Sequence, residues 1–240
     1  MLDIHSHILP GVDDGARNLN ESFCLLSEMH RQGISDVIAT PHFYPDSDSR
    51  ESYFRRIIPA YKSFKKEYTE KLSAGEKLPN VYLGSEVLYF PGILSSDHIS
   101  DFTLNNSRYL LLELTDAAVD DKLFEELYIL KNERRIIPII AHIERYHKAK
   151  KFKKLLKFIE SEKIPAQVNA SSFFVKGLAK PAEKLIKQNR AVFIATDAHS
   201  PEKRPPMMAS ALGVISKKFG ERYKERLIRN SERLLEEILI

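Results

Sequence analysis

The chain has 240 residues, of which 43% are hydrophobic, which suffices for a substantial core and fits one large domain spanning residues 1–240. Its 37 basic and 33 acidic residues leave a net charge of +4, so we interpret the lysines at 148–157 as a solvated helix face and expect no nucleic-acid binding. The single cysteine, Cys24, excludes an intramolecular disulfide framework and a thiolate metal cluster.

Apolar runs of strand length alternate along the chain with segments of helical periodicity. The predicted strands lie near residues 1–5, 36–40, 80–85, 108–114, 136–142, 164–169 and 191–196. Helices are predicted over residues 21–32, 120–134 and 152–163, and the tail from Arg204 onward is expected to form helices on the outside. The alternation predicts a parallel sheet flanked by helices, either open or closed into a barrel.

Two segments between these elements were considered for function. Cys24 lies in the first predicted helix and lacks the arginine spacing of a cysteine-dependent phosphatase, because Arg31 follows it after six residues, so we expect it to pack. Residues 43–56 form a polar, turn-rich insertion, expected to be a mobile rim. Its Phe43, Tyr44 and Tyr53 could flank a substrate ring or pack against the loop.

No apolar run approaches the roughly 20 residues that cross a bilayer, and no leader segment precedes the first strand. The sequence therefore predicts a cytoplasmic protein with no transmembrane segment. Its oligomeric state is left open.

The most informative feature is that successive predicted strands end in residues that bind metal ions. The first strand runs into a His-x-His pair, in which both imidazoles share one face. With later strand ends, nine candidate ligands follow: His5, His7, Asp14, His42, Glu86, Glu113, His142, Asp197 and His199. Since five or six strands offer ligands at their carboxyl ends, a closed ring is needed, and we predict a distorted (β/α)7 TIM-like barrel.

Nine ligands exceed what one ion requires. A mononuclear zinc site uses three or four protein ligands, so the set indicates two or three divalent ions with a bridging carboxylate. Structural histidines and capping carboxylates could explain any one of these residues. They explain less well why five of the eight histidines stand at strand ends.

These residues form motifs that resemble the polymerase and histidinol phosphatase superfamily. Within it, the chain resembles bacterial metal-dependent protein tyrosine phosphatases that act in capsule and exopolysaccharide regulation. The resemblance covers essentially the whole chain. Its motifs are DIHSHILPGVDDGA at 3–16, ATPH at 39–42, GSE at 84–86, QVNASS at 167–172, and TDAH at 196–199 with RPP at 204–206.

The resemblance implies a distorted seven-stranded barrel with a trinuclear site. It implies that one ion is held by His5, His7, Glu86 and Asp197; that Glu86 bridges to a second held by Glu113 and His142; and that a third is held by Asp14, His42 and His199. Many relatives have histidine where this chain has Glu113. A carboxylate there favours harder ions such as manganese or iron over zinc.

The resemblance also implies that Arg145 and Arg204 hold the phosphate. A planar guanidinium can bind two phosphoryl oxygens at once, whereas an isolated loop arginine usually pairs with a surface carboxylate. The expected reaction is attack of a hydroxide, generated at the ions, directly on phosphorus. If the reaction uses a general acid, the candidates are Asp13 and a metal-bound water.

Three functions remain in competition at this point. The first is a protein tyrosine phosphatase acting on a phosphotyrosine protein, which the resemblance suggests is the tail of a membrane-associated bacterial tyrosine kinase. The second is a small-molecule phosphoesterase such as a histidinol phosphatase. The third is a non-catalytic, metal-stabilised regulatory domain.

Overall fold

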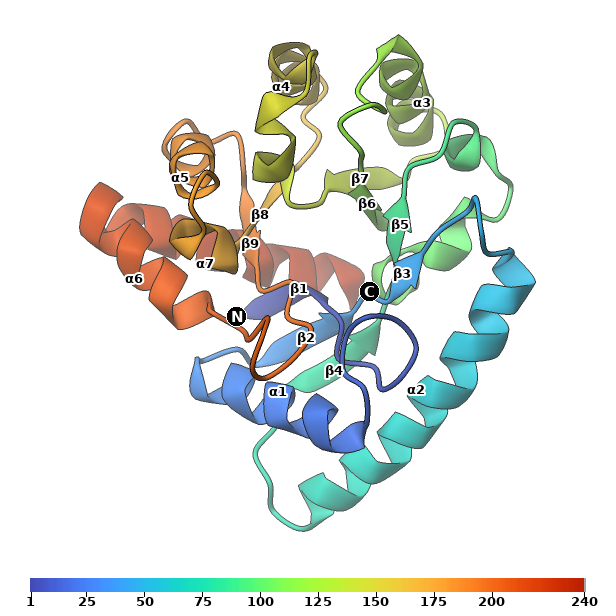
Figure 1. Cartoon of the computed structure of the whole chain (residues 1–240), viewed down its shortest axis with the longest axis vertical. Helices are drawn as coiled ribbons and strands as arrows, with labels where there is room; N and C mark the ends of the chain where they lie inside the picture. The colour runs from blue at the N-terminus through green and yellow to red at the C-terminus, as the bar shows by residue number, and fades with distance from the viewer. Residues whose placement is uncertain (240) are drawn as a thin grey trace.

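The computed structural model describes residues 1–239, and residue 240, the last of the predicted domain, lies outside the described residues. Parallel strands surround a common axis and helices cover them from outside (Figure 1). The strands are β1 Leu2–Ser6, β2 Asp36–Ala39, β3 His42–Phe43, β4 Asn80–Leu83, β5 Glu86–Leu88, β6 Tyr109–Glu113, β7 Ile137–Ile140, β8 Gln167–Asn169 and β9 Phe193–Ala195.

The strands close into a ring in the order in which they occur along the chain. Three sheets, β1-β2-β4, β3-β5-β6-β7 and β8-β9, are joined by parallel bridges between Ser6 and Ala198 and between Ile140 and Ala166. Short breaks separate β2 from β3 and β4 from β5, so each of these pairs forms one interrupted strand of the barrel. Pro41 lies in the first break and has no amide hydrogen to donate to a neighbouring strand. The predicted seven-stranded distorted barrel is confirmed, with shorter strands than expected.

Seven α-helices lie outside the ring or across its amino end in the part of the chain that the structure describes. They are α1 Leu19–Arg31, α2 Arg50–Ser73, α3 Asp121–Asn132, α4 Phe152–Ser161, α5 Ala179–Lys187, α6 Met208–Phe219 and α7 Glu221–Ile238. Side chains cap the amino ends of three of them: Asn18 accepts from the Glu21 amide, Ser49 from the Ser52 amide and Asp120 from the Leu123 amide. Short 3₁₀ helices occupy Ile93–Ser95, Ile99–Phe102, Leu104–Asn106, Ile143–Lys148 and Ala170–Phe174.

The interior of the ring below its mouth is apolar. It holds a buried cluster that is separate from the larger core between strands and helices, and its members include Leu2, Ile4, Ile38, Leu104, Leu111, Ile139, Ala195, Leu234 and Ile238. The last two belong to α7, which closes the amino end of the barrel. The candidate ligands lie above this apolar filling, at the opposite, carboxyl-terminal mouth.

A bulge in β1 determines which of its side chains face that interior. Between its paired residues Asp3 and Ser6, β1 contains one residue more than the facing part of β2. Strict alternation would turn Ile4 inward and His5 outward, but the extra residue lets both point into the barrel. His7 follows on the same side as His5.

Two expectations for the periphery are wrong. Cys24 is exposed on α1 instead of packed. The insertion at 43–56 is not turn-rich throughout, because α2 begins at Arg50 and Tyr53 is buried, donating to Ser85 Oγ at 2.7 Å. Phe43 is also buried and stacks on Phe102 with ring centroids 4.1 Å apart. Aromatic packing therefore anchors this segment to the barrel.

Gly84 offers a test of how tightly the barrel interior is packed. A Cβ at Gly84 would lie 2.8 Å from Leu104 Cδ2 and 3.1 Å from Ile38 Cγ2. We predict that Gly84→Ala lowers the free energy of unfolding by about 1–3 kcal/mol, measured by urea denaturation.

The matched control is Gly213→Ala in α6, where a Cβ would meet nothing within 4 Å. This change should stabilise the protein by about 0.5–1 kcal/mol, since alanine is the better helix former. Equal effects of the two substitutions would contradict the packing argument.

Candidate metal centre

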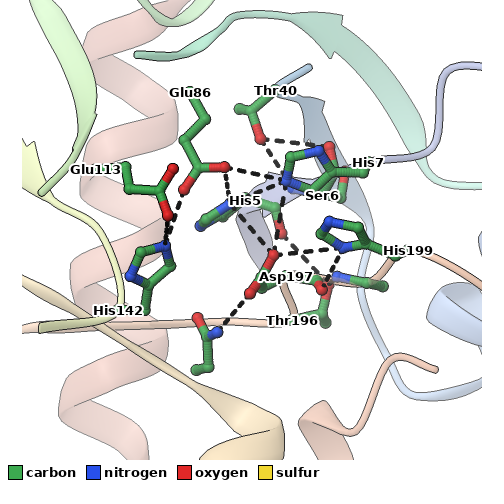
Figure 2. A network of polar contacts seen from close by, with 12 residues as sticks. His5, Ser6, His7, Thr40, Glu86, Glu113, His142, Thr196, Asp197 and His199 are labelled. Carbon is green, nitrogen blue, oxygen red and sulfur yellow. Dashed lines mark hydrogen bonds and ion pairs between the residues drawn. The ribbon is translucent and has the colours of Figure 1, made fainter. Parts of the chain in front are cut away.

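All nine predicted ligands meet at the carboxyl-terminal mouth of the barrel, and Figure 2 shows seven of them. They come from β1 and the loop after it, the starts of β3 and β5, the end of β6, and the turns that follow β7 and β9. His142 and Asp197 have positive φ of 30° and 50°, which redirects their side chains at the ends of their strands. Both residues are buried, whereas the side chain of Asp14 is 65% exposed.

The loop after β1 brings Asp14 back over the histidines. A Cβ at Gly15 would lie 2.2 Å from the His7 carbonyl oxygen, so only glycine allows this close approach. The Ala16 amide then donates to the same carbonyl at 2.9 Å. Asp14 Oδ1 consequently lies 3.4 Å from His42 Nε2 and 3.3 Å from His199 Nε2.

The ligand atoms are separated by the distances expected around shared ions. Glu86 Oε2 lies 3.1 Å from His5 Nε2, 3.2 Å from His7 Nε2 and 3.0 Å from His42 Nδ1. Two ligands each about 2.1 Å from one ion stand roughly 3.0–3.5 Å apart. Glu86, at the centre of the cluster, therefore has the position of a bridging carboxylate.

The opposite oxygen of Glu86 faces a second group of candidate ligands. Its Oε1 lies 2.9 Å from His142 Nε2, and the same nitrogen is 3.5 Å from Glu113 Oε1. His42 Nδ1 also stands 4.0 Å from Glu113 Oε2. The resemblance implies that each histidine binds one ion. In the structure, His7 and His42 each lie close to the candidate ligands of two ions.

Four of the five imidazoles are held through Nδ1 so that Nε2 faces the cluster. His5 Nδ1 contacts Gln167 Oε1 at 3.3 Å and His7 Nδ1 contacts Asp13 Oδ2 at 2.8 Å. His142 Nδ1 contacts the Tyr146 hydroxyl at 3.0 Å, and His199 Nδ1 contacts the Asp197 carbonyl at 2.9 Å. Such outer partners fix the ring orientation of metal-binding histidines and increase their basicity.

The buried polar atoms of the site fit a bound cation. Glu86 Oε2, His42 Nδ1 and His199 Nε2 are buried and have no hydrogen-bond partner, although the first two lie only 3.0 Å apart. Buried nitrogen and oxygen atoms rarely remain unpaired. Divalent ions bound by the ligand groups to which these residues belong would satisfy the three atoms.

The charges of the site favour cations as well. Burial lowers the pKa of His42, but Asp14 and Glu86 outweigh it and raise the pKa to about 10. Burial together with Glu86 raises the pKa of the Glu113 carboxyl to about 7, because two carboxylates in one buried site repel each other. Divalent ions relieve that repulsion.

Arg145 and Arg204 flank the cluster and converge on one oxygen. Arg145 Nη2 donates to Asp197 Oδ2 at 2.6 Å and Arg204 Nη2 donates to it at 2.8 Å, while Asn169 Nδ2 donates a third bond at 2.6 Å. Asp197 Oδ1 lies 3.4 Å from His5 Nε2. The side chains of the two arginines are 36% and 39% exposed, so donors remain available at the mouth.

Sequence reasoning missed the residues that orient the ligands. Gln167 Oε1 accepts from the His142 amide at 2.9 Å as well as facing His5, and its amide nitrogen donates to Asn169 Oδ1 at 2.7 Å. Gln167 and Asn169 are polar and stand two apart in β8, a pattern that places both on one face of the strand, and the structure buries them inside the mouth. Tyr146 lies in the 3₁₀ helix that follows His142, and the left-handed backbone at His142 begins the turn that brings the two side chains together.

Asp13 orients a ligand and is poorly suited to donate a proton. Its carboxylate accepts from the amides of Gly15 at 2.9 Å and His42 at 3.2 Å, in addition to its contact with His7. Burial raises the pKa of Asp13, but His7 outweighs this and holds the pKa below its usual value. The carboxyl is therefore ionised near neutral pH.

Among the three aromatic residues considered for the rim, only Tyr44 lies there. It is 38% exposed and stacks on the His42 ring with centroids 4.9 Å apart. A ring in this position can contact a planar substituent entering the mouth.

Comparison with known proteins agrees with this geometry. Residues 1–236 match the family described as capsular polysaccharide synthesis, CpsB/CapC. The chain belongs to this family. It is 31% identical to the tyrosine-protein phosphatase CpsB of Streptococcus agalactiae over 98% of both chains, and 30% identical to the tyrosine-protein phosphatase YwqE of Bacillus subtilis over 98% of this chain and 91% of YwqE.

Solved structures share the fold of this CpsB/CapC family member. A structure from a study of YwqE from Bacillus subtilis and CpsB from Streptococcus pneumoniae, described as unique metal-dependent tyrosine phosphatases, has a TM-score of 0.86 and 28% identity, covering 99% of this chain and 95% of the other. A histidinol phosphate phosphatase from Lactococcus lactis has a TM-score of 0.58 and 13% identity, which shows a common fold. None of the helices within residues 1–239 is long and apolar enough to span a bilayer.

Gln167 allows the orienting contacts to be tested. We predict that Gln167→Ala weakens metal binding by about 10- to 100-fold, because His5 and the backbone at His142 lose their common acceptor. Competition with a chromophoric chelator measures the affinity, and circular dichroism checks the fold.

Gln32→Ala serves as the control, because it removes an amide that is bonded to Glu28 and to the Pro206 carbonyl outside the site. Its metal affinity should match that of the wild type. An unchanged affinity in Gln167→Ala would refute the orienting role.

Proposed function

We propose that the chain is a metal-dependent protein tyrosine phosphatase whose domain, residues 1–240, holds two or three divalent ions. The observation that carries the proposal is that nine candidate ligands and two guanidinium groups converge at one barrel mouth. Membership of the CpsB/CapC family and the names of its relatives support it.

The proposed ligand sets follow the contacts around Glu86. His5, His7 and Asp197 would hold one ion with Glu86, while His142 and Glu113 would hold the second through its other oxygen. Asp14, His42 and His199 would hold the third. Two of the four ligand carboxylates, Glu86 and Glu113, share the second set, which favours manganese or iron over zinc.

The reaction that this site fits is hydrolysis of a phosphate monoester. Bound divalent ions supply charge neutralisation and lower the pKa of water, so that a nucleophile is available near neutral pH. Arg145 and Arg204 would hold phosphoryl oxygens with their planar guanidinium groups and stabilise the charge that shifts during transfer. No candidate protein nucleophile is needed.

Tyrosine is a suitable leaving group for a site without a strong acid. The conjugate acid of its phenolate has a pKa of about 10, far below that of a serine alcohol, so protonation of the departing oxygen matters less. Asp13, ionised and bonded to His7, does not fill that role. Tyr44 would contact the substrate ring from its position over His42.

The physiological substrate is proposed from family resemblance. It is a phosphotyrosine protein, and we propose the tail of a bacterial tyrosine kinase in polysaccharide regulation, on the cytoplasmic side where ATP is present. Rates on a phosphotyrosyl peptide and on histidinol phosphate, compared at equal metal loading, test this choice. Much faster hydrolysis of histidinol phosphate would overturn it.

Loss of a single ligand should separate metal binding from folding. We predict that His199→Ala abolishes turnover and lowers the metal content by about one ion per chain, with little change in the thermal midpoint. The reason is that the apolar clusters of the barrel do not include the ligands. Elemental analysis and thermal melts measure the two effects, and unfolding at room temperature would show a structural site instead.

Arg204 separates phosphate binding from metal binding. A guanidinium has no lone pair for a metal, so Arg204→Ala should keep the metal complement and lose about 30- to 1000-fold in kcat/KM on an aryl phosphate. Inhibition by inorganic phosphate should weaken in parallel, and lysine should restore activity only in part.

Arg17→Ala is the control, because this arginine is 81% exposed and pairs with Glu21 on the surface. It should behave as the wild type. An Arg204→Ala protein with unchanged efficiency and phosphate inhibition would show that the phosphate pocket is wrongly placed.

A further inference from the structure

A groove outside the mouth runs between α4 and α5, which are neighbours in the outer ring of helices (Figure 1). Its volume is about 590 Å³, and its lining includes Phe152, Leu156, Pro181 and Leu185. A second cavity of about 350 Å³ shares Leu156 and Gln188 with it and extends toward the amino end of the barrel, where the ion pair of Arg190 and Glu160 lines it. The result is an elongated depression with an apolar floor.

The rim of this groove is positively charged. Lys150 and Lys153 line one side, and Lys180 and Lys184 the other. No carboxylate lines the larger cavity, and no ion pair involves any of these four lysines within residues 1–239. Their neighbours Lys151 and Lys154 differ, because both pair with Asp121.

The groove begins beside the loop that supplies one of the phosphate-binding candidates. His147 lines the end of the groove nearest the barrel mouth. It lies two residues after Arg145 in the 3₁₀ helix Ile143–Lys148, which connects β7 to α4. A chain lying in the groove can therefore continue toward the mouth of the barrel.

We propose that this groove docks an acidic peptide segment with apolar side chains that flanks the phosphotyrosine of the substrate protein. The inference rests on the proposed phosphatase function and adds a second contact site for the same substrate. Four lysines without counter-charges complement carboxylates, and the apolar floor complements hydrophobic side chains between them.

The shape and composition of the groove favour a peptide over other polyanions. A nucleic acid would be expected to use arginines and several stacking aromatics, but the lining of the larger cavity contains no arginine and one aromatic, Phe152, besides His147. A flat anionic membrane would meet a protruding surface more readily than a concave one.

Charge reversal on both walls tests the proposal. The variant Lys153→Glu/Lys184→Glu should lose about tenfold in kcat/KM on a phosphotyrosyl peptide flanked by Asp, Glu and Leu, and the loss should shrink at high salt. Its efficiency on p-nitrophenyl phosphate should stay at the wild-type value, since this small substrate reaches only the mouth. On a peptide with Asn and Gln in place of Asp and Glu, variant and wild type should differ little.

The control is Lys62→Glu/Lys66→Glu on α2, which changes the net charge equally without touching the groove. It should keep wild-type efficiency on both peptides. Equal losses in both variants would show a general charge effect, and no loss in either would show that the groove does not contact the substrate; both results overturn the proposal.

Binding measured without turnover separates this proposal from the phosphatase function. Fluorescence anisotropy of the labelled, unphosphorylated acidic peptide should show weaker binding to the groove variant than to wild type and control. If the groove variant loses binding to phosphatidylglycerol vesicles but binds the peptide as the wild type does, the groove contacts a membrane and the docking proposal is overturned. Should the wild type hydrolyse neither p-nitrophenyl phosphate nor the phosphopeptide, the phosphatase function itself fails, and the docking proposal with it.

Discussion

Mutual repulsion between the carboxylates of Glu86 and Glu113 is the constraint that governs the mouth of the barrel. Glu86 and Glu113 face a common imidazole at the mouth of the barrel, and the pKa of Glu113 is raised to about 7 by burial and by Glu86. Five imidazoles, two guanidiniums and the divalent ions that we propose offset this charge. The apolar filling below the mouth and α7 across the amino end contain none of these polar groups, so we expect the barrel to fold without them.

The periodicity of the chain was sufficient to predict the closed ring and the convergence of the candidates that stand at strand ends, but not the position of Asp14, which the turn at Gly15 brings back over His7. Parallel strands end at the same edge, so a residue type repeated after each apolar run is brought together whatever the details of the loops. The outer partners were harder to find, because Gln167 reaches His5 across 162 positions of sequence and no local pattern records such a contact. The bulge in β1 was also invisible, since alternation alone would have turned His5 away from the site. The predictions for Cys24 and for residues 43–56 were wrong for another reason. The exposed face of a helix and the packing of aromatic side chains depend on tertiary contacts, which composition does not specify.

In our proposal, the barrel mouth carries out the chemistry and the groove between α4 and α5 recognises the residues that flank the phosphotyrosine. Arg145 and Arg204 both donate to Asp197 Oδ2, so the pair is already placed beside the proposed ions when a phosphate arrives. Such preorganisation reduces the cost of ordering the donors during the reaction. A phosphotyrosine alone carries little sequence information, and the lysine-lined groove between α4 and α5 would supply it through flanking residues. The 3₁₀ helix that bears Arg145 and ends at the groove links the two sites physically.

We propose that divalent ions held by these nine residues are required for the hydrolysis, and a metal titration tests this directly. Protein stripped with a chelator is reloaded stepwise with manganese, and bound metal per chain is measured by elemental analysis alongside the rate on a phosphotyrosyl peptide. We expect no turnover in the stripped protein and activity that rises with bound metal to a plateau at about two or three ions per chain. Full activity of the metal-free protein, or a protein that binds no manganese and stays inactive, would contradict it.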